Sequence, residues 1–456
     1  MPTPSEATPN AAKALRRELG LFDGIALVVG TIIGSGVFLV PSGIAKQLNS
    51  ALPVILVWVV GGVLSLLGGL ALGEMGAMFP KAGGLYVYLR HAYGRPVGFL
   101  YGWGLLTLIH SGSIATLAVA FRLYFGQLFT LNVLQQKAVG VSSVLFLTLV
   151  NCFGLRVGKF VQNLFAVAKL GGLAIMIFLL VRHAQGNVLA QNFRLPDSWK
   201  VSLVPLGVSL VAVLWAYEGW HVVSFTTGEF KRPQRDLPLS LLYGTVIVAF
   251  VYVLANFGYY SVLPLVGIQQ SECVAASAVN QAIGSGGKQA ISLLILISIF
   301  GAANGMVLAG PRVYYAMAKD GLFLTLFGHM NHRYSTPLVG IVIQGVWASL
   351  LTLMGTFQQL FTYVIFTSWL FYAIAVIGVV ILRFRHPHVN RPFRAPFLPL
   401  LVALFVLAGL GMAASTIIAD PKHALIGIGL ILSGLPVYLL FRNTEARREE
   451  VPLPTV

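Results

Sequence analysis

The sequence predicts an all-α integral membrane protein with twelve transmembrane helices, in which two five-helix inverted repeats precede two further helices. Composition is the first reason, because 57% of the 456 residues are hydrophobic and only 10% are charged. Soluble globular proteins carry about 25% charged residues. The other two reasons are the presence of apolar segments long enough to cross a bilayer and the interruptions found inside two of them.

Twelve apolar segments have lengths suited to the hydrocarbon core, which a helix crosses in about 20 residues. Short turn-rich or charged stretches, such as 79–84 and 231–233, separate them. The predicted spans are 21–44, 52–79, 97–128, 138–153, 160–181, 204–227, 239–263, 290–317, 338–353, 357–382, 397–418 and 424–441.

The distribution of Lys and Arg predicts the orientation of these spans. An even number of spans places both termini on one side, and cytoplasmic loops carry an excess of basic residues. With both termini in the cytoplasm, 21 of the 30 Lys and Arg residues lie on that side and 7 on the other, while Arg122 and Lys169 lie within spans. We therefore expect a multi-pass protein of the cell membrane with cytoplasmic termini.

Several classes of function find no support in the sequence. The net charge of +16 is explained by the loops, and no basic stretch is interleaved with aromatic residues as nucleic-acid binding would require. No spacing of His, Cys and carboxylates fits a metal site and no phosphate-binding loop is present, so we expect no cofactor, no metal and no enzyme activity. Cys152 and Cys273 are far apart and do not indicate a disulfide framework.

The first span is interrupted by the segment 30–38, which contains Gly30, Gly34, Ser35 and Gly36. Each Gly weakens a helix by up to about 1 kcal/mol relative to Ala, and an unwound backbone is tolerated at membrane depth only where it lines a cavity. Unwinding frees amides that suit a carboxylate and carbonyls that suit an ammonium, the two ends of an amino acid. The alternative is close helix packing, because Gly30 and Gly34 have a small-xxx-small spacing.

The sixth span has a similar interruption, where Glu218 and Gly219 lie among aromatic residues. Transporters built from inverted repeats carry broken helices at corresponding positions of the two halves. The predicted units are a cytoplasmic tail (1–20), two repeats (21–182 and 183–383), two extra helices (384–441) and a second cytoplasmic tail (442–456).

These motifs resemble the amino acid–polyamine–organocation superfamily, and within it the L-amino acid transporter type, including its prokaryotic members. The resemblance covers residues from about Leu21 to about Phe441. The segments that carry it are 30–38, 80–86, 161–163 with 169–170, 217–220 and 301–321.

The resemblance implies a substrate site at the two breaks. The hydroxyl of Ser35 and the amides of Ser35, Gly36 and Val37 would bind the substrate carboxylate, with Gly34 and Gly36 leaving room for the approach. Carbonyls of Ile32, Trp215 and Glu218 would bind the substrate amine. Trp215 would also cover the substrate as a gate, although a Trp of the core or of the membrane interface is the alternative. We expect Gly36→Val to abolish binding without unfolding the protein.

Lys169 is the most informative charge, because a lysine within an apolar span costs about 2.5–3.5 kcal/mol on insertion scales. In sodium-coupled relatives of the implied fold a sodium ion bridges spans one and eight, and the family lysine takes its place. Ala302 stands where the family often has a hydroxyl residue, which leaves the second partner of Lys169 open. The alternative is a lysine that reaches the membrane surface and has no role in transport.

Other polar residues within the spans allow two interpretations each. Glu218 either faces the cavity and carries a proton or cation, or forms hydrogen bonds within the helix bundle. Glu74 fits a structural pair with a nearby base or a proton relay, and Asn304 is a third residue considered for a proton or cavity role. Arg122 and His110 are expected to make bundle contacts rather than line the cavity. Asp23 is expected to be the N-cap of the first span.

The sequence thus predicts a sodium-independent secondary transporter, an exchanger of small neutral L-amino acids that works by alternating access. A proton-coupled symporter and an amino acid sensor or channel remain alternatives. Animal members of the type bind a glycoprotein subunit through a cysteine after the third span. This chain has no cysteine between Leu128 and Lys137, so we expect no disulfide-linked partner.

Overall fold

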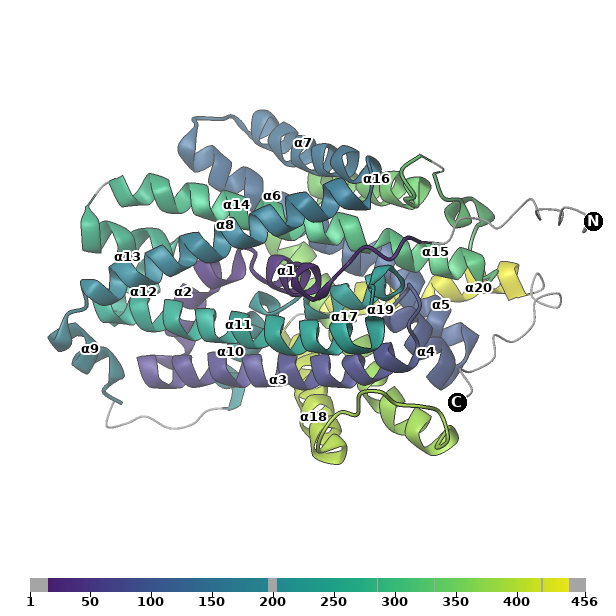
Figure 1. The fold of residues 1–456 in the computed structure, drawn as a ribbon. Helices are drawn as coiled ribbons and strands as arrows, with labels where there is room; N and C mark the ends of the chain where they lie inside the picture. The colour runs from purple at the N-terminus through teal and green to yellow at the C-terminus, as the bar shows by residue number, and fades with distance from the viewer. Residues whose placement is uncertain (1–14, 196–202, 285, 332, 420, 443–456) are drawn as a thin grey trace, which may run out of the picture.

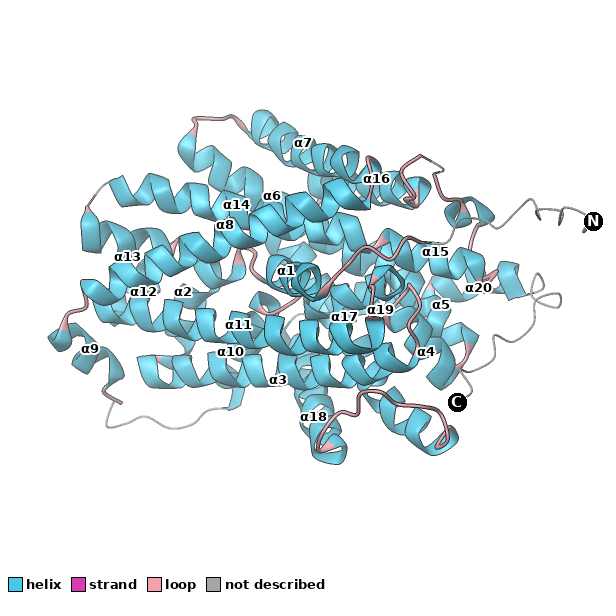
Figure 2. Cartoon of the chain, in the orientation of Figure 1, coloured by secondary structure: helices cyan, strands magenta, loops and turns pink. Residues whose placement is uncertain are grey.

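The structure is a computed structural model that describes residues 15–195, 203–284, 286–331, 333–419 and 421–442. Within these ranges the regular structure is helical, apart from one isolated bridge between Leu19 and Phe230. The helices are joined by loops of different lengths, with a long one before α18 (Figure 2). Most of the predicted tails at 1–20 and 442–456 lies outside the described residues.

The membrane spans follow the predicted order, and several of them consist of more than one helix (Figure 1). The first five are α1 (Leu21–Ile32) with α2 (Gly36–Leu48), α3 (Ala51–Met78), α5 (Arg95–Gly104) with the π-helix η1 (Leu105–Ile109) and α6 (His110–Leu128), α7 (Val133–Cys152) and α8 (Leu155–Arg182). The next five are α10 (Leu203–Ala216) with the 3₁₀-helix η2 (Trp220–Glu229), α11 (Pro233–Val262), α14 (Gly286–Ala309) with α15 (Pro311–Lys319), α16 (Leu338–Met354) and α17 (Phe357–Arg385). The last two are α18 (Leu398–Ala419) and α19 (Pro421–Leu432) with α20 (Gly434–Arg442).

The number of spans agrees with the prediction. Ten helical segments in the described ranges are long and apolar enough to cross a membrane, and the bent pair α1 and α2 provides an eleventh span. The twelfth is α16, an apolar helix of 17 residues. Short helices that were not predicted lie between the spans: α4 (Leu85–Tyr93), α9 (Gly186–Phe193), α12 (Leu265–Gln270), α13 (Val274–Ile283) and η3 (Thr325–Gly328).

The broken first span lies in the middle of the helix bundle. In Figure 1, α1 is enclosed by α8 and α14 on one side and by α11 on the other, and it contacts all three. The lipid-facing surface is apolar, as on α8, where Phe160 is 66% and Phe178 is 64% exposed. The segment before α1 and the helix α20 lie at the same end of the bundle (Figure 1).

The start of α1 differs from the prediction. Asp23 is not the N-cap, because the helix begins at Leu21 after Gly20 and places Asp23 in its first turn. From there the carboxylate accepts a hydrogen bond from the backbone N–H of Gly20 at 2.9 Å and another from Asn163 Nδ2 at 2.7 Å. The side chain therefore still stabilises this helix end, from a position three residues later.

Candidate substrate site

The first span is broken where the sequence predicts it. The helix α1 ends at Ile32, α2 begins at Gly36, and the two axes meet at 44°. Ile33 adopts an extended conformation with ψ of 92°, so the carbonyls at the end of α1 are released from the helical pattern. This break leaves polar backbone groups in the centre of the bundle, where they need other partners.

The sixth span is broken opposite the first. The helix α10 ends at Ala216, and Gly219 has a φ of +117°, a left-handed conformation that glycine adopts without strain. A Cβ atom at Gly219 would lie 2.9 Å from the carbonyl carbon and oxygen of Thr31. The two breaks are also joined directly, because the Thr31 hydroxyl donates a hydrogen bond to the Gly219 carbonyl at 3.0 Å.

Lys169 lies against the break of the first span. Its ammonium group is fully buried and donates to the carbonyls of Gly30 at 2.8 Å and Ile33 at 2.6 Å. A third bond, at 2.9 Å, goes to the carbonyl of Ser298 in α14. The backbone of Ser298 is thus the second partner that the alanine at position 302 left open. A burial of this kind does not fit a lysine that reaches the membrane surface.

Tyr252 is a site residue that the sequence did not indicate. Its hydroxyl lies 3.0 Å from the carbonyl oxygen of Ile32 and 3.0 Å from that of Ala216, the last residues of α1 and α10. One side chain from α11 therefore holds the C-terminal ends of both broken helices. The chain contains 16 tyrosines, and nothing in the sequence distinguishes Tyr252 from the others. Its role becomes visible only because the two breaks lie close together in space.

A small cavity of about 20 Å³ lies between the two breaks. It is lined by Thr31, Ile32, Gly34, Ser35, Gly36, Ser113, Leu117, Trp215, Ala216, Glu218 and Met306. This volume holds about one water molecule, so an amino acid fits only after neighbouring side chains move. Within the described part of the chain, the Ser35 hydroxyl and Glu218 Oε2 have no hydrogen-bond partner. Of the residues predicted for the site, Val37 and Lys169 lie beside this cavity rather than in its wall.

Gly36 has a packing role that the sequence reasoning did not include. A Cβ atom there would lie 2.6 Å from both the Cα and the Cβ of Ala216 in α10. Side chains at this distance displace the neighbouring backbone, so Gly36→Val would disturb the packing of α2 against α10. The expectation that this variant loses only binding stays untested, and the close contact predicts a loss of stability in addition.

Trp215 separates the small cavity from a much larger one. The larger cavity has a volume of about 800 Å³ and is lined by parts of α2, α6, α10, α17 and α18. Trp215 lines both cavities and is 7% exposed. Its ring packs edge-on against Phe361 and Phe357, with centroid distances of 5.1 and 6.4 Å. A residue that gates access between the two cavities would lie at this position.

Glu218 is both bonded within the bundle and placed at the wall of the small cavity. Its Oε1 accepts a hydrogen bond of 2.5 Å from the Tyr372 hydroxyl, which also lies 3.0 Å from Nδ1 of His221. Its Oε2 has no partner among the described residues, and Glu218 lines the small cavity. One carboxylate oxygen is thus bound within the bundle while the side chain borders the predicted substrate position.

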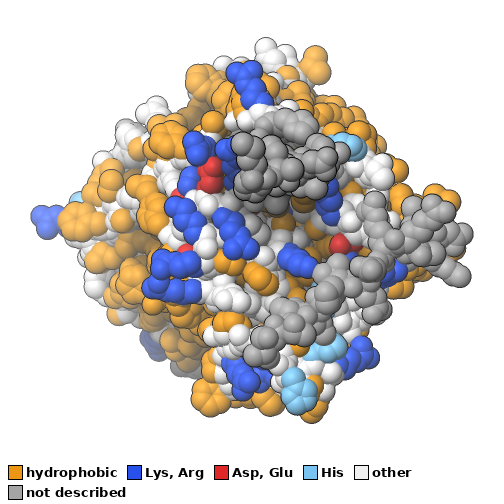
Figure 3. Space-filling model, turned by 45° about the vertical axis from the view of Figure 1, so that its right-hand side comes forward, with side chains coloured by type: hydrophobic (Ala, Val, Ile, Leu, Met, Phe, Trp, Pro, Cys, Tyr) orange, Lys and Arg blue, Asp and Glu red, His pale blue; other side chains and the backbone are white. Residues whose placement is uncertain are grey.

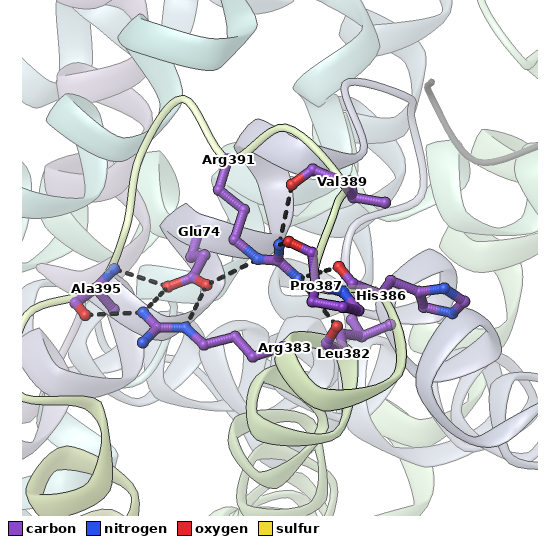
Figure 4. A network of polar contacts seen from close by, with 8 residues as sticks. All are labelled: Glu74, Leu382, Arg383, His386, Pro387, Val389, Arg391 and Ala395. Carbon is purple, nitrogen blue, oxygen red and sulfur yellow. Dashed lines mark hydrogen bonds and ion pairs between the residues drawn. The ribbon is translucent and has the colours of Figure 1, made fainter. Parts of the chain in front are cut away.

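Glu74 is held away from both cavities by two arginines (Figure 4). Its Oε1 accepts from Arg383 Nε at 2.8 Å, and its Oε2 accepts from Arg383 Nη2 at 2.6 Å and from the N–H of Ala395 at 2.7 Å. Arg391 Nε lies 3.7 Å from Oε1. This network joins α3 to the end of α17 and to the loop before α18. It fits the interpretation of Glu74 as the partner of a nearby base rather than as a proton relay.

The other polar span residues considered from the sequence, Asn304, His110 and Arg122, are bonded within the bundle. Asn304 accepts from Asn151 Nδ2 and donates to Gln162 Oε1, both at 2.9 Å, which links α14 to α7 and α8. His110 Nε2 lies 2.8 Å from the carbonyl oxygen of Met306, and Arg122 donates to the carbonyl of Thr352 at 3.3 Å. None of the three lines either cavity.

The end of the bundle near the N-terminus is closed by the segment 18–20, which we call the N-terminal strap. The amides of Glu18 and Leu19 donate to the carbonyl of Glu229 at 2.8 and 2.9 Å, and the amide of Lys231 donates to the Leu19 carbonyl at 2.9 Å. The Glu229 carboxylate pairs with Arg312 at 3.0 Å, and both side chains are buried. The strap thus lies over a buried ion pair between η2 and α15.

The neighbouring loops add to this closure. Asp320, after α15, accepts from the Tyr86 hydroxyl at 2.8 Å and forms an ion pair with Arg90 of α4. Burial and the nearby Arg90 and Lys81 lower the pKa of His91 to about 4, so this ring is neutral at pH 7 and stacks on Phe79.

Twelve apolar spans with two breaks that face one central cavity define a membrane transporter of the inverted-repeat class. The chain belongs to the amino acid permease family, whose pattern matches residues 19–441, and to the L-amino acid transporter type within the amino acid–polyamine–organocation superfamily. No group of three or more His, Cys, Asp or Glu residues that could hold a metal occurs in the described ranges.

Several transporters are similar to this chain over almost its whole length. The serine/threonine exchanger SteT of Bacillus subtilis is 34% identical, with 95% of this chain and 98% of SteT covered. The human b(0,+)-type amino acid transporter 1 is 33% identical, with 94% and 88% covered. The human cystine/glutamate transporter is 30% identical, with 94% and 85% covered.

The crowding at Gly219 predicts a loss of stability on substitution. We expect Gly219→Ala to lower the free energy of unfolding by about 1–2 kcal/mol for the left-handed conformation, plus the cost of the contact with Thr31. Gly321→Ala is the matched control, because Gly321 has a φ of +76° but a Cβ atom there would meet no neighbouring atom within 4 Å. Thermal unfolding in detergent should show a lower midpoint for Gly219→Ala than for the control, and equal midpoints would contradict the close approach of the two breaks.

Proposed function

We propose that the protein is a sodium-independent exchanger of small neutral L-amino acids that works by alternating access. The observation that carries the proposal is the cavity between the two breaks. It is bordered by released backbone groups and by the Ser35 hydroxyl, which has no partner among the described residues. Its similarity to SteT, named as a serine/threonine exchanger, supports both the exchange and the small substrates.

The carboxylate of the substrate would bind at the start of α2. The first amides of a helix have no partner within it, and the positive end of the helix dipole favours an anion. The helix α2 has no acidic residue in its first turn and no side-chain cap, so Ser35, Gly36 and Val37 offer their amides to a ligand. The Ser35 hydroxyl adds a donor that has no partner within the described ranges, and Gly34 leaves the approach open.

The substrate amine would bind to carbonyls at the ends of α1 and α10. The Ile32 carbonyl already accepts from Tyr252, and the Trp215 carbonyl accepts from the amide of Glu218 at 2.9 Å. A carbonyl oxygen accepts two hydrogen bonds, so each retains one for an ammonium. The carbonyl of Glu218 and the side-chain oxygens at the cavity wall add further acceptors at the same place.

The walls beside the breaks favour a small side chain. Ser113 and Leu117 of α6 and Met306 of α14 border the cavity, and the cavity is narrow. A bulky side chain would have to displace these residues in a closely packed interior, which costs free energy. These three residues are therefore our candidates for the selectivity of the site.

The position of Lys169 supports the proposal of sodium independence. Its ammonium occupies the carbonyls of Gly30 and Ile33 together with that of Ser298, so these oxygens are bonded without a metal ion. The bonds join the broken first span to α14, which is the link that a bridging sodium ion would otherwise make. We assign Lys169 a positioning role, since it acts on the substrate through the shape of the break.

Alternating access would use the closures at the two ends of the bundle. The large cavity leads to Trp215 from the end opposite to the strap, and the strap and the pair of Arg312 with Glu229 close the other end. With both termini in the cytoplasm, as the distribution of Lys and Arg favours, this arrangement is closed toward the cytoplasm. We also propose that the chain works without a disulfide-linked partner.

Proton-coupled symport is the second candidate, because Glu218 has an oxygen at the cavity without a partner among the described residues. The proposal is tested with purified protein in liposomes that are loaded with L-serine. We expect uptake of labelled L-alanine to require internal amino acid and to be unchanged when sodium is replaced by choline. Uptake into empty liposomes driven by a pH gradient would establish symport instead, and binding without counterflow would establish a sensor.

The Ser35 hydroxyl gives a direct test of the carboxylate site. A hydrogen bond to a charged group contributes about 1.5–3 kcal/mol, so Ser35→Ala should raise the KM for exchange about tenfold or more. The thermal stability should not change, because the hydroxyl has no partner among the described residues. Ser111→Ala is the control, since Ser111 is also buried and without such a partner but does not line the cavity. An unchanged KM in Ser35→Ala would place the substrate elsewhere.

Replacing Lys169 tests its positioning role. Lys169→Met keeps much of the length but leaves the carbonyls of Gly30 and Ile33 without a donor, at a cost of about 1–3 kcal/mol for each buried group. We expect the exchange rate to fall at least about tenfold and a larger loss of kcat than of apparent affinity. Lys46→Met, at an exposed lysine of α2, is the control. A wild-type rate in folded Lys169→Met would refute the role.

A further inference from the structure

A second pocket, apart from the substrate site, lies at the end of the bundle where the strap is found. Its volume is about 260 Å³, and it forms where α7 ends, α8 begins and the loop before α16 passes the N-terminal segment. Its wall includes Arg16, Phe153, Arg156, Arg333 and Ser335.

The pocket is basic. Three arginines line it, while Glu18 is the single acidic residue among its described lining residues. Glu18 accepts a hydrogen bond of 3.0 Å from Arg156 Nε and so offsets one of the three charges. The guanidinium of Arg333 is stacked over the ring of Tyr334 at 5.3 Å, which orders this side chain. A surplus of positive charge remains for an anion.

Backbone and hydroxyl donors accompany the arginines. The helix α8 begins at this pocket after Gly154, without a side-chain cap and without an acidic residue in its first turn. Its first amides are therefore free to donate. Ser335 lines the pocket, is 9% exposed and adopts a φ of +52°. A polar side chain held in an unfavourable backbone conformation is typical of a functional site.

The surroundings of the pocket are apolar and face lipid. Phe153 is 48% exposed, Val157 is 41% exposed, and Phe160 follows on the same helix at 66%. At this end of the molecule, Lys and Arg side chains gather on the surface and apolar side chains border them (Figure 3). A free phosphate would use only the donors, whereas a phospholipid would also cover the exposed aromatic and aliphatic side chains.

We propose that this pocket binds the headgroup phosphate of an anionic phospholipid, with the acyl chains along the outer face of α8. Basic pockets between transmembrane helices at the cytoplasmic side are suited to such headgroups. Arg16 lies just before the strap and Glu18 is its first residue, so the bound headgroup contacts the part of the chain that closes this end. The site is independent of the proposed substrate.

The proposal is tested by lipid binding to the purified full chain, measured by native mass spectrometry with phosphatidylglycerol and phosphatidylcholine. We expect a preference for phosphatidylglycerol that falls about fivefold in Arg16→Gln and in Arg333→Gln, since each basic residue near a membrane surface contributes about that factor. Arg235→Gln is the matched control, because it removes an exposed arginine near the start of α11, outside the pocket.

Four results would overturn the proposal. The first is an unchanged lipid preference in the Arg16 and Arg333 variants, and the second is an equal loss in Arg235→Gln, which would indicate a general effect of charge. The third is displacement of the lipid by millimolar inorganic phosphate, which would indicate a site for a free anion. The fourth is a lipid preference that survives Ser335→Ala and both arginine variants combined, measured on protein with a normal unfolding midpoint.

Discussion

The contact on which the site depends is the set of hydrogen bonds between the Lys169 ammonium and the end of α1. A helix that stops inside the bilayer leaves carbonyls without partners, and each such group costs free energy in an apolar environment. The bonds to Gly30 and Ile33, with the bond from Tyr252 to Ile32, satisfy these carbonyls. The broken helix is stable because the side chains of Lys169 in α8 and Tyr252 in α11 supply the hydrogen bonds that the missing helical turn would have made.

These partners are also arranged so that part of the break stays available. Lys169 and Tyr252 approach from the sides of α8 and α11, while the cavity lies on the side of Ser35 and Trp215. The lysine charge stands at the negative end of the α1 dipole, where it is favourable. In the same way, the start of α2 keeps its amides without a cap. The backbone groups of the break that face α8 and α11 are thus hydrogen-bonded to Lys169 and Tyr252. Other donors and acceptors of the break remain directed toward the cavity.

Much of this arrangement was predictable because it depends on local composition. Span lengths follow from hydropathy, the breaks follow from glycines at 30–36 and 219, and an intramembrane lysine is unusual enough to attract attention at once. The contacts that were missed are between segments far apart in the sequence. The partner of Lys169 in α14 is a backbone carbonyl, which leaves no side-chain signal at Ser298. Tyr252 and the approach of Gly36 to Ala216 became visible only with the helices in place.

The bond between the Thr31 hydroxyl and the Gly219 carbonyl ties the two interruptions to each other. The bond connects the last turn of α1 to the residue that precedes η2, so a movement that separates the two breaks would lose a buried hydrogen bond. A carrier in which the two halves of the site shift together passes through fewer intermediate shapes with both ends open. In this chain a small hydroxyl group forms that link between the two breaks.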